Sequence, residues 1–124
     1  MKEIIQGQIL AKANHYLAVG GCSGRRIIKD DKIRAYEQSF LEQCEIYRHK
    51  HISSRFKLIV EVYHGSIRFD LDNSLKTLLD CLQQAGAITD DKLCFEIAAS
   101  KHIDKNKPRV EFTIIELNEQ IKLF

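Results

Sequence analysis

The chain has 124 residues, 19 of them basic and 17 acidic, so its formal net charge is only +2. This length suits a single domain over residues 1–124, and the balanced charge excludes a uniformly basic nucleic-acid binder, so a DNA surface would need local clusters of charge. Four widely spaced cysteines without a C-x-x-C pair, and the absence of an apolar run of about 20 residues, predict a cytoplasmic protein with no membrane-spanning segment.

The first part of the chain is expected to hold a strand, a loop and a helix. Residues 4–10 form an apolar stretch typical of a strand, and a polar turn containing Asn14 follows. Residues 20–26 contain three glycines but lack the Gly-Lys-Ser/Thr ending of a P-loop, so a flexible basic loop is predicted there. Asp30 or Asp31 can then cap a helix whose apolar residues recur every three or four positions. These residues are Ile33, Tyr36, Phe40, Leu41, Cys44 and Tyr47.

Three further strands are predicted in the remaining chain. Residues 56–63 are rich in β-branched and aromatic side chains, and residues 93–100 and 109–117 have a similar character. Turn-forming residues at 104–108 connect the last two strands, which favours an antiparallel hairpin.

A second helix is predicted between the first two of these strands. It begins near Asp72, and Gly86 is a natural stop. Its apolar residues fall on one arc at helical spacing, which indicates one buried face. They are Leu71, Leu75, Leu78, Leu79, Leu82 and Ala85. The order strand, helix, strand, helix, strand, strand predicts an α/β (α+β) fold in which two main helices pack against a mixed β-sheet.

Charged residues gather at the start of the second helix. Because residues two apart in an extended segment point the same way, Asp70 and Asp72 can aim their carboxylates together, and Lys76 follows one helical turn later. A second acidic pair, Asp90 and Asp91, lies where the chain turns back after the helix. Unpaired carboxylates repel one another, and a hard divalent cation is the usual reason to gather them. The pattern therefore predicts a magnesium site.

Other interpretations of the acidic motif compete with a magnesium site. An EF-hand needs glycine at its sixth position and an acid at its twelfth, where this chain has Leu75 and Cys81, so that interpretation fails. A phosphatase of the D-x-D type is not favoured either, because it would carry its nucleophile near the start of a larger domain. A helix cap explains one aspartate, and Lys76 alone is an ordinary partner for Asp72 one turn away, but neither explains the whole set of charges.

Over residues 70–91 the chain reads D-L-D-N-S-L-K, then L-D-C-L, A-G and D-D. This pattern resembles the D-L-D-N-x-x-K, D-x-L, A-G, D-D signature of the RusA family of Holliday-junction resolvases. The resemblance implies a RusA-like fold and a homodimeric, Mg²⁺-dependent endonuclease that nicks four-way DNA junctions in recombination and repair, with one acidic site in each subunit. It places the catalytic, metal-binding aspartates at Asp70, Asp72 and Asp91 and the catalytic lysine at Lys76.

A junction-binding protein also needs a basic surface. The candidate DNA contacts are Arg25, Arg26, Lys29, Arg68 and Asn14. Asn14 and Tyr16 match part of a proline-rich segment that the RusA family often has near its start, but the prolines are absent here. A zinc site at His49 and His51 is not favoured, because no second pair of ligands completes it.

Two other functions stay open at this stage. One is a catalytically silent protein that binds branched DNA, and the other is a magnesium nuclease acting on other branched DNA such as flaps. The intact set of Asp70, Asp72, Asp91 and Lys76 argues against the silent binder, since a binder has no need of negative charge beside DNA.

Overall fold

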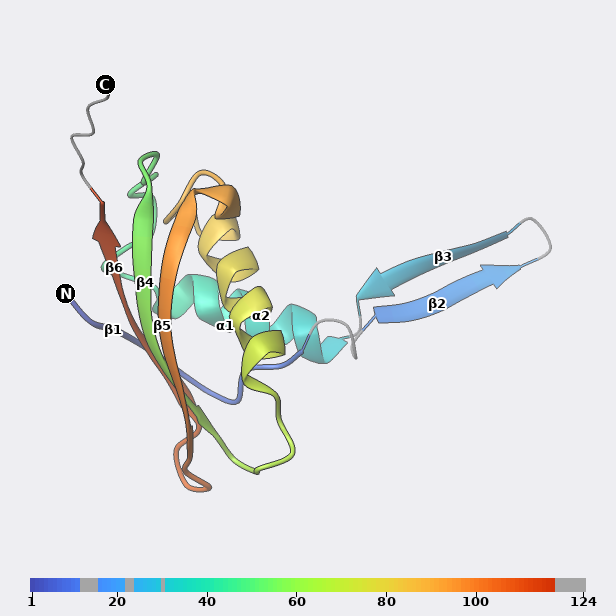
Figure 1. Ribbon diagram of the computed structural model, residues 1–124. Coiled ribbons are helices and arrows are strands. Elements are labelled where there is room, and N and C mark those ends of the chain that lie inside the picture. Colours follow the sequence, from blue (N-terminus) through green and yellow to red (C-terminus); the bar gives the residue numbers. More distant parts are fainter. Residues whose placement is uncertain (12–15, 22–23, 30, 118–124) are drawn as a thin grey trace.

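Strand β4 (Phe56–His64) lies inside a four-stranded sheet with the strand order β1-β6-β4-β5 (Figure 1). The other strands are β1 (Glu3–Gln6), β6 (Arg109–Glu116) and β5 (Cys94–Ile103), and β2 (Tyr16–Gly21) and β3 (Gly24–Lys29) form a separate antiparallel pair. This computed structural model describes residues 1–11, 16–21, 24–29 and 31–117, with side-chain positions for residues 1–11 and 31–117.

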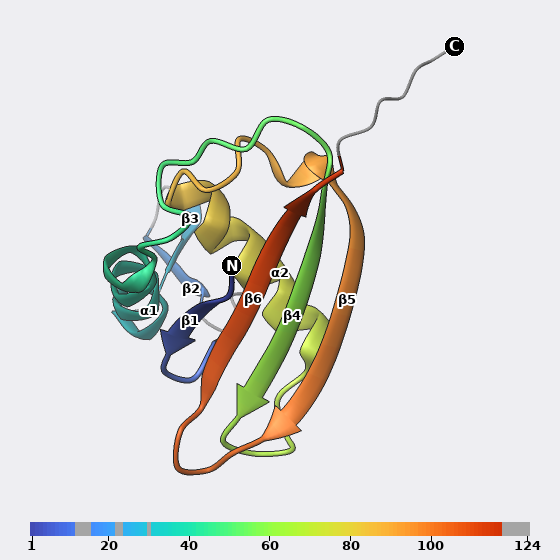
Figure 2. The same ribbon diagram turned by 90° about the vertical axis from the view of Figure 1, so that its left-hand side faces the viewer.

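Helices α1 (Asp31–Gln43) and α2 (Leu71–Gln84) cover one face of the main sheet, and the short helix η2 (Asp91–Leu93) leads into β5 (Figure 2). The residues of β4 alternate, so that every second side chain from Phe56 to His64 is buried beneath the helices. Leu78 and Leu82 of α2 are fully buried in the same core. The predicted α+β fold, one domain with a mixed sheet and two helices, is confirmed. Neither helix in the described part of the chain is long and apolar enough to cross a membrane.

The predicted hairpin of the last two strands is wrong. Strand β5 pairs parallel to β4 at the edge of the sheet, whereas β6 pairs antiparallel to the other side of β4. A strand, helix and strand in succession return the chain parallel to its start, which places β5 beside β4 under α2. The inner position then goes to β6, because its Val110, Phe112 and Ile114 are buried while β5 is largely exposed.

Two predictions in the first part of the chain also need correction. Most of the loop expected over residues 20–26 instead belongs to β2 and β3, where Gly20 pairs with Arg25 and Gly21 with Gly24, and residues 22–23 lie outside the described part of the chain. Apolar residues on both sides of the turn signalled this hairpin. The strand expected over residues 4–10 ends at Gln6, because Gly7 has a φ of 110° and its amide donates to the Pro108 carbonyl.

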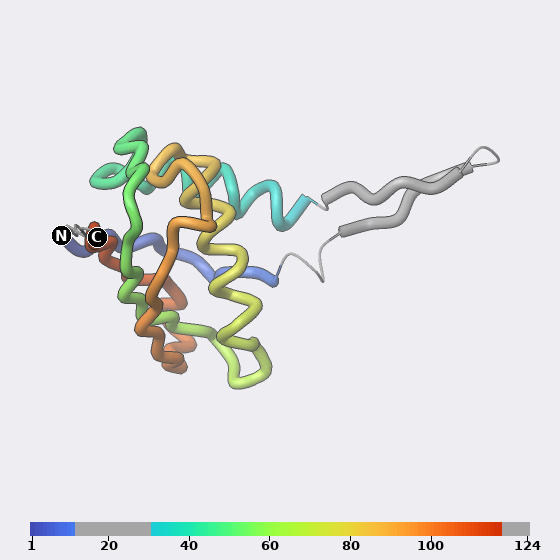
Figure 3. The backbone as a smooth tube through the Cα atoms, turned by 45° about the horizontal axis from the view of Figure 1, so that its top comes forward, coloured from blue at the N-terminus to red at the C-terminus, as the bar shows by residue number. Residues whose placement is uncertain are grey.

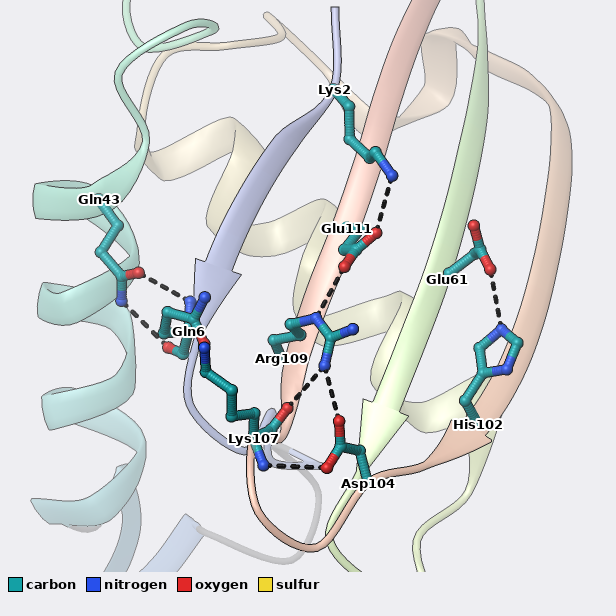
Figure 4. A network of polar contacts seen from close by, with 9 residues as sticks. All are labelled: Lys2, Gln6, Gln43, Glu61, His102, Asp104, Lys107, Arg109 and Glu111. Carbon is teal, nitrogen blue, oxygen red and sulfur yellow. Dashed lines mark hydrogen bonds and ion pairs between the residues drawn. The ribbon is translucent and has the colours of Figure 1, made fainter.

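The opposite face of the sheet carries paired charges (Figure 4). Glu111 accepts from Lys2 at 2.9 Å and from Arg109 at 2.7 Å, and these two cations hold the pKa of its carboxyl below the usual range. Arg109 also lies over the ring of Tyr63, and Glu61 faces His102 at 2.9 Å. Because the cations here are matched by acids, this face offers little net positive charge to a DNA backbone.

The core contact between α2 and the sheet is expected to hold the helix in place. Leu78→Ala should lower the free energy of unfolding by about 2–5 kcal/mol, because it leaves a cavity where a fully buried side chain stood. Urea denaturation measures this loss, with the exposed Gln84→Ala as the control on the same helix. Equal stability of the two variants would contradict this packing.

Candidate active site

Asp70 and Asp72 lie together at the N-terminal end of α2. Asp70 has an extended backbone, with φ −94° and ψ 138°, and occupies the cap position without a side-chain cap hydrogen bond. Its Oδ2 instead accepts from the Asn73 side-chain amide at 3.2 Å, and Oδ1 of Asp72 accepts from the Asn73 backbone amide at 2.9 Å. The capping interpretation therefore fails for Asp70. Both carboxylates are exposed to solvent.

Lys76 lies one turn further along α2, with an exposed side chain. Its ammonium makes no ion pair with any residue whose side chain the structure describes, Asp72 included. The ordinary pairing of Asp72 with Lys76 along the helix is thus not formed. A lysine ammonium that forms no ion pair with the described side chains is available to a phosphate.

His64, the last residue of β4, is fully buried and contacts residues on both sides of Asp70. Its ring stacks on Phe69, with centroids 5.2 Å apart and planes 14° from parallel. Its Nε2 lies 3.2 Å from Oγ of Ser74, and that hydroxyl donates to the Asp70 carbonyl at 2.8 Å. His64 is thus linked to the cap residue of α2 through Phe69 on one side and Ser74 on the other.

Gln8 fixes which nitrogen of His64 carries the proton. The Gly65 amide can only donate, and it donates to Oε1 of Gln8 at 2.7 Å. Nε2 of Gln8 must therefore be the donor to Nδ1 of His64, 2.8 Å away. His64 is then neutral, with its proton on Nε2 directed at Ser74. Burial lowers the pKa of His64, and nearby Lys101 lowers it further, against a smaller opposing effect of Asp70.

Asp91 lies at the other end of α2, at the start of η2. Its backbone amide donates to Oε1 of Gln83, in the last turn of α2, at 3.2 Å. Asp90 caps η2 by accepting from the Lys92 amide at 2.9 Å, and this hydrogen bond holds the pKa of Asp90 low. Asp90 therefore has a structural task, while the carboxylate of Asp91 is exposed.

The expected convergence of the three aspartates within one chain is wrong. Helix α2 has 14 residues, which at about 1.5 Å each separate its ends by about 21 Å. Figure 3 shows η2 and the C-terminal end of α2 together at one end of the molecule, away from the start of the helix. No group of three or more His, Cys, Asp or Glu side chains that could hold a metal ion occurs among the residues described.

The other candidate residues are less well defined by the structure. Arg68 is exposed two residues before Asp70, and its amide donates to Ser66 Oγ at 3.3 Å. Arg25, Arg26 and Lys29 belong to β3, but their side chains lie outside the described part of the structure, as does all of Asn14. These predicted DNA contacts stay predictions.

Sequence reasoning missed Gln8, His64 and Ser74. A signal for His64 was present, because it continues the alternation of Phe56, Leu58, Val60 and Val62 and so faces the core. A buried polar group needs partners, which a single sequence does not identify.

The fold is a one-sided α+β sheet whose longest helix begins with exposed carboxylates. A family model described as Endodeoxyribonuclease RusA matches residues 6–115. The chain belongs to this family and is an endodeoxyribonuclease. It is also 29% identical over 101 residues to the Crossover junction endodeoxyribonuclease RusA of Aquifex aeolicus (strain VF5), a match that covers 80% of this chain and 78% of that protein.

The lowered pKa of His64 predicts a pH-dependent stability. The unfolded chain binds a proton at His64 near its ordinary pKa of about 6.5, and the folded chain does so only at lower pH. The stability that His64 contributes should be fully present above about pH 6.5 and lost as pH falls through the folded pKa.

Urea denaturation of the wild type and of His64→Phe, between about pH 7.5 and about pH 5, measures this effect. The wild type should lose more stability than the variant over that interval. Parallel pH profiles would contradict the assignment of a neutral, buried His64.

Proposed function

We propose that this endodeoxyribonuclease is a homodimer that nicks four-way DNA junctions and requires Mg²⁺. The observation that carries the proposal is a pair of exposed carboxylates at the start of α2 in a chain of this family. Lys76 follows them one turn later and forms no ion pair with the described side chains. The related Aquifex protein is named a crossover junction endodeoxyribonuclease, which supports the choice of substrate. Cys44, Cys81 and Cys94 form no disulfide with any residue that the structure describes, which suits the reducing cytoplasm.

The acidic residues have the chemistry that a magnesium ion requires. Mg²⁺ prefers oxygen ligands and is usually held by one or two carboxylates together with water and substrate phosphates. Asp70 and Asp72 each use one oxygen for Asn73 and keep the other free of hydrogen bonds from the described residues. We assign Asp70, Asp72 and Asp91 as the metal ligands.

The remaining chemistry falls to the protein's own residues. When bound, Mg²⁺ would lower the pKa of water and neutralise charge on the phosphate. Lys76 would hold the scissile phosphate as a compact cation and stabilise the negative charge that develops on its oxygens. Asn73 holds both carboxylates, because its side-chain amide donates to Asp70 and its backbone amide donates to Asp72.

The proposed metal site needs a second copy of the chain. Since α2 is about 21 Å long and Asp91 is hydrogen-bonded to Gln83 in its last turn, a rigid chain cannot bring Asp91 to Asp70 and Asp72 at its start. A two-fold axis that sets two α2 helices antiparallel would place Asp91 of one copy beside Asp70 and Asp72 of the other. Each of the two sites would then take ligands from both chains.

Strand β5 is the element best placed to form that two-fold contact. It has ten residues, lies at the edge of the sheet and exposes Phe95, Ile97 and Ile103. Its first residue follows η2, and its last lies near the turn before α2, where Lys101 donates to the Ile67 carbonyl at 3.0 Å. Antiparallel pairing of two β5 strands would therefore carry η2 of each copy toward the acidic turn of the other.

DNA binding is proposed through positive side chains of two segments and through Asn14. Arg68 precedes the acidic turn, and Arg25, Arg26 and Lys29 lie on β3, with Asn14 before β2. These residues would contact phosphates and orient the junction, since phosphate contacts supply most of the affinity for DNA.

Nicking assays test the proposal directly. Wild-type protein should nick a labelled four-way junction with Mg²⁺ and fail with a chelator, and Asp72→Asn should abolish nicking. The variant should bind the junction as tightly as the wild type or more tightly, because it loses a negative charge near the phosphates.

A flap and a linear duplex serve as substrate controls in the same assay. Nicking of the flap in preference to the junction would favour a nuclease for other branched DNA. Binding without Mg²⁺-dependent nicking of any substrate would favour the silent binder. Loss of binding together with cleavage in Asp72→Asn would point to a folding role for Asp72.

Mixing two inactive variants tests the shared site. If ligands come from both chains, a dimer of Asp70→Asn with Asp91→Asn contains one fully wild-type site. Random exchange should then restore about a quarter of the wild-type sites, because half of the dimers are mixed and each has one intact site. Sites built within single chains would give no restoration.

The matched control mixes Asp70→Asn with Asp72→Asn. Both substitutions fall on the same side of the shared site, so every site in every dimer keeps one defect. This mixture should stay inactive, and recovery here would contradict the assignment of ligands to chains.

A further inference from the structure

We infer that Gln8, His64 and Ser74 form a positioning device that sets the orientation of Asp70 for metal binding. The inference rests on the proposed function, because it assigns a task to residues that support the proposed ligand. None of the three residues reaches the carboxylate itself. They act on the backbone that carries it.

The device is a directed series of hydrogen bonds. Gln8 donates to Nδ1 of His64 at 2.8 Å, Nε2 of His64 faces Ser74 Oγ at 3.2 Å, and Ser74 donates to the Asp70 carbonyl at 2.8 Å. The Gly65 amide donates to Oε1 of Gln8, and Nε2 of Gln8 also donates to the Ile9 carbonyl at 2.8 Å, so the orientation of the Gln8 amide and the direction of every bond after it are fixed. The series therefore allows one arrangement of protons.

Burial makes this arrangement rigid. His64 and Ser74 are buried, and Phe69 stacks on the His64 ring directly before Asp70. A polar group that loses its partner in such a place costs about 1–3 kcal/mol, so alternative orientations of the turn are disfavoured. The carbonyl of Asp70 is held by two donors, the hydroxyl and the amide of Ser74.

The carboxylate of Asp70 depends on this support because it has little other anchorage. Its one hydrogen bond from the described residues is that of the Asn73 side chain at 3.2 Å, and it forms no cap bond to the helix. Residues behind metal ligands orient them, and their loss typically lowers metal affinity or activity about 10–100-fold. Ser74 and His64 fill that role here.

Ser74→Ala tests the device, with Thr77→Val as the matched control. Both replace a buried hydroxyl of α2, but Thr77 donates to the carbonyls of Leu10 at 2.6 Å and Asn73 at 3.3 Å rather than to that of Asp70. Mn²⁺ binding, followed by the electron paramagnetic resonance signal of the free ion, should weaken about 10-fold or more in Ser74→Ala. It should change less than about two-fold in Thr77→Val, whatever the two changes do to thermal stability.

Nicking kinetics provide the second measurement. Ser74→Ala should lower kcat about 10-fold or more and leave the KM for junction DNA within about two-fold, because the substrate-binding surface is unchanged. Equal losses in both variants would reduce the device to a general contribution to stability and overturn the inference. Wild-type-like Mn²⁺ binding and kcat in Ser74→Ala would also overturn it.

A measurement on the wild type covers the case in which the variants fail to fold. Long-range ¹H–¹⁵N spectra at neutral pH should show His64 protonated on Nε2 and unprotonated on Nδ1. The opposite tautomer, or an imidazolium ring, would contradict the direction of the series.

Failure of the proposed function and failure of this inference give different results. If the wild type itself neither binds Mn²⁺ nor nicks DNA, the proposed function fails. If the wild type does both and Ser74→Ala does both equally well, only this inference fails.

Discussion

The rigidity of helix α2 is the constraint on which the account of this protein depends. A packed helix keeps its ends at a fixed separation, and here that separation is about 21 Å for 14 residues. Leu78 and Leu82 are fully buried in the core that also contains the inward side chains of β4, so the helix cannot bend to bring its ends together. The acids at its two ends belong to different places on one molecule.

This separation changes how the acidic residues are understood. In the proposed function, Asp70 and Asp72 would supply half of a ligand set, and Asp91, on the same chain but at the far end of the helix, would supply the other half. Two-fold pairing at β5 would join the halves and would make dimer formation a condition of metal binding. An exposed edge strand is normally a liability for a monomer, and a partner strand would remove it.

Several features could be predicted from sequence because they depend on local patterns. Alternation along β4, the apolar arc of α2 and the stop at Gly86, which has a φ of 72°, are all local. The partners of β5 and β6 were not predictable in this way, since strand pairing depends on which strand buries both faces. The separation of Asp91 from Asp72 could have been predicted, because the length of a helix over residues 72–85 follows from its number of residues. The hydrogen bond between Gln8 and His64 could not have been predicted, because the two residues are 56 positions apart in the sequence.

Crystals soaked with Mn²⁺ test the central claim most directly, because anomalous scattering locates the ion without assumptions about the chain. The account predicts a peak bounded by the carboxylates of Asp70 and Asp72 from one chain and by that of Asp91 from a two-fold-related partner. A peak held by residues of a single chain would contradict it. A Mn²⁺ ion at full occupancy that lies away from Asp70 would contradict it as well.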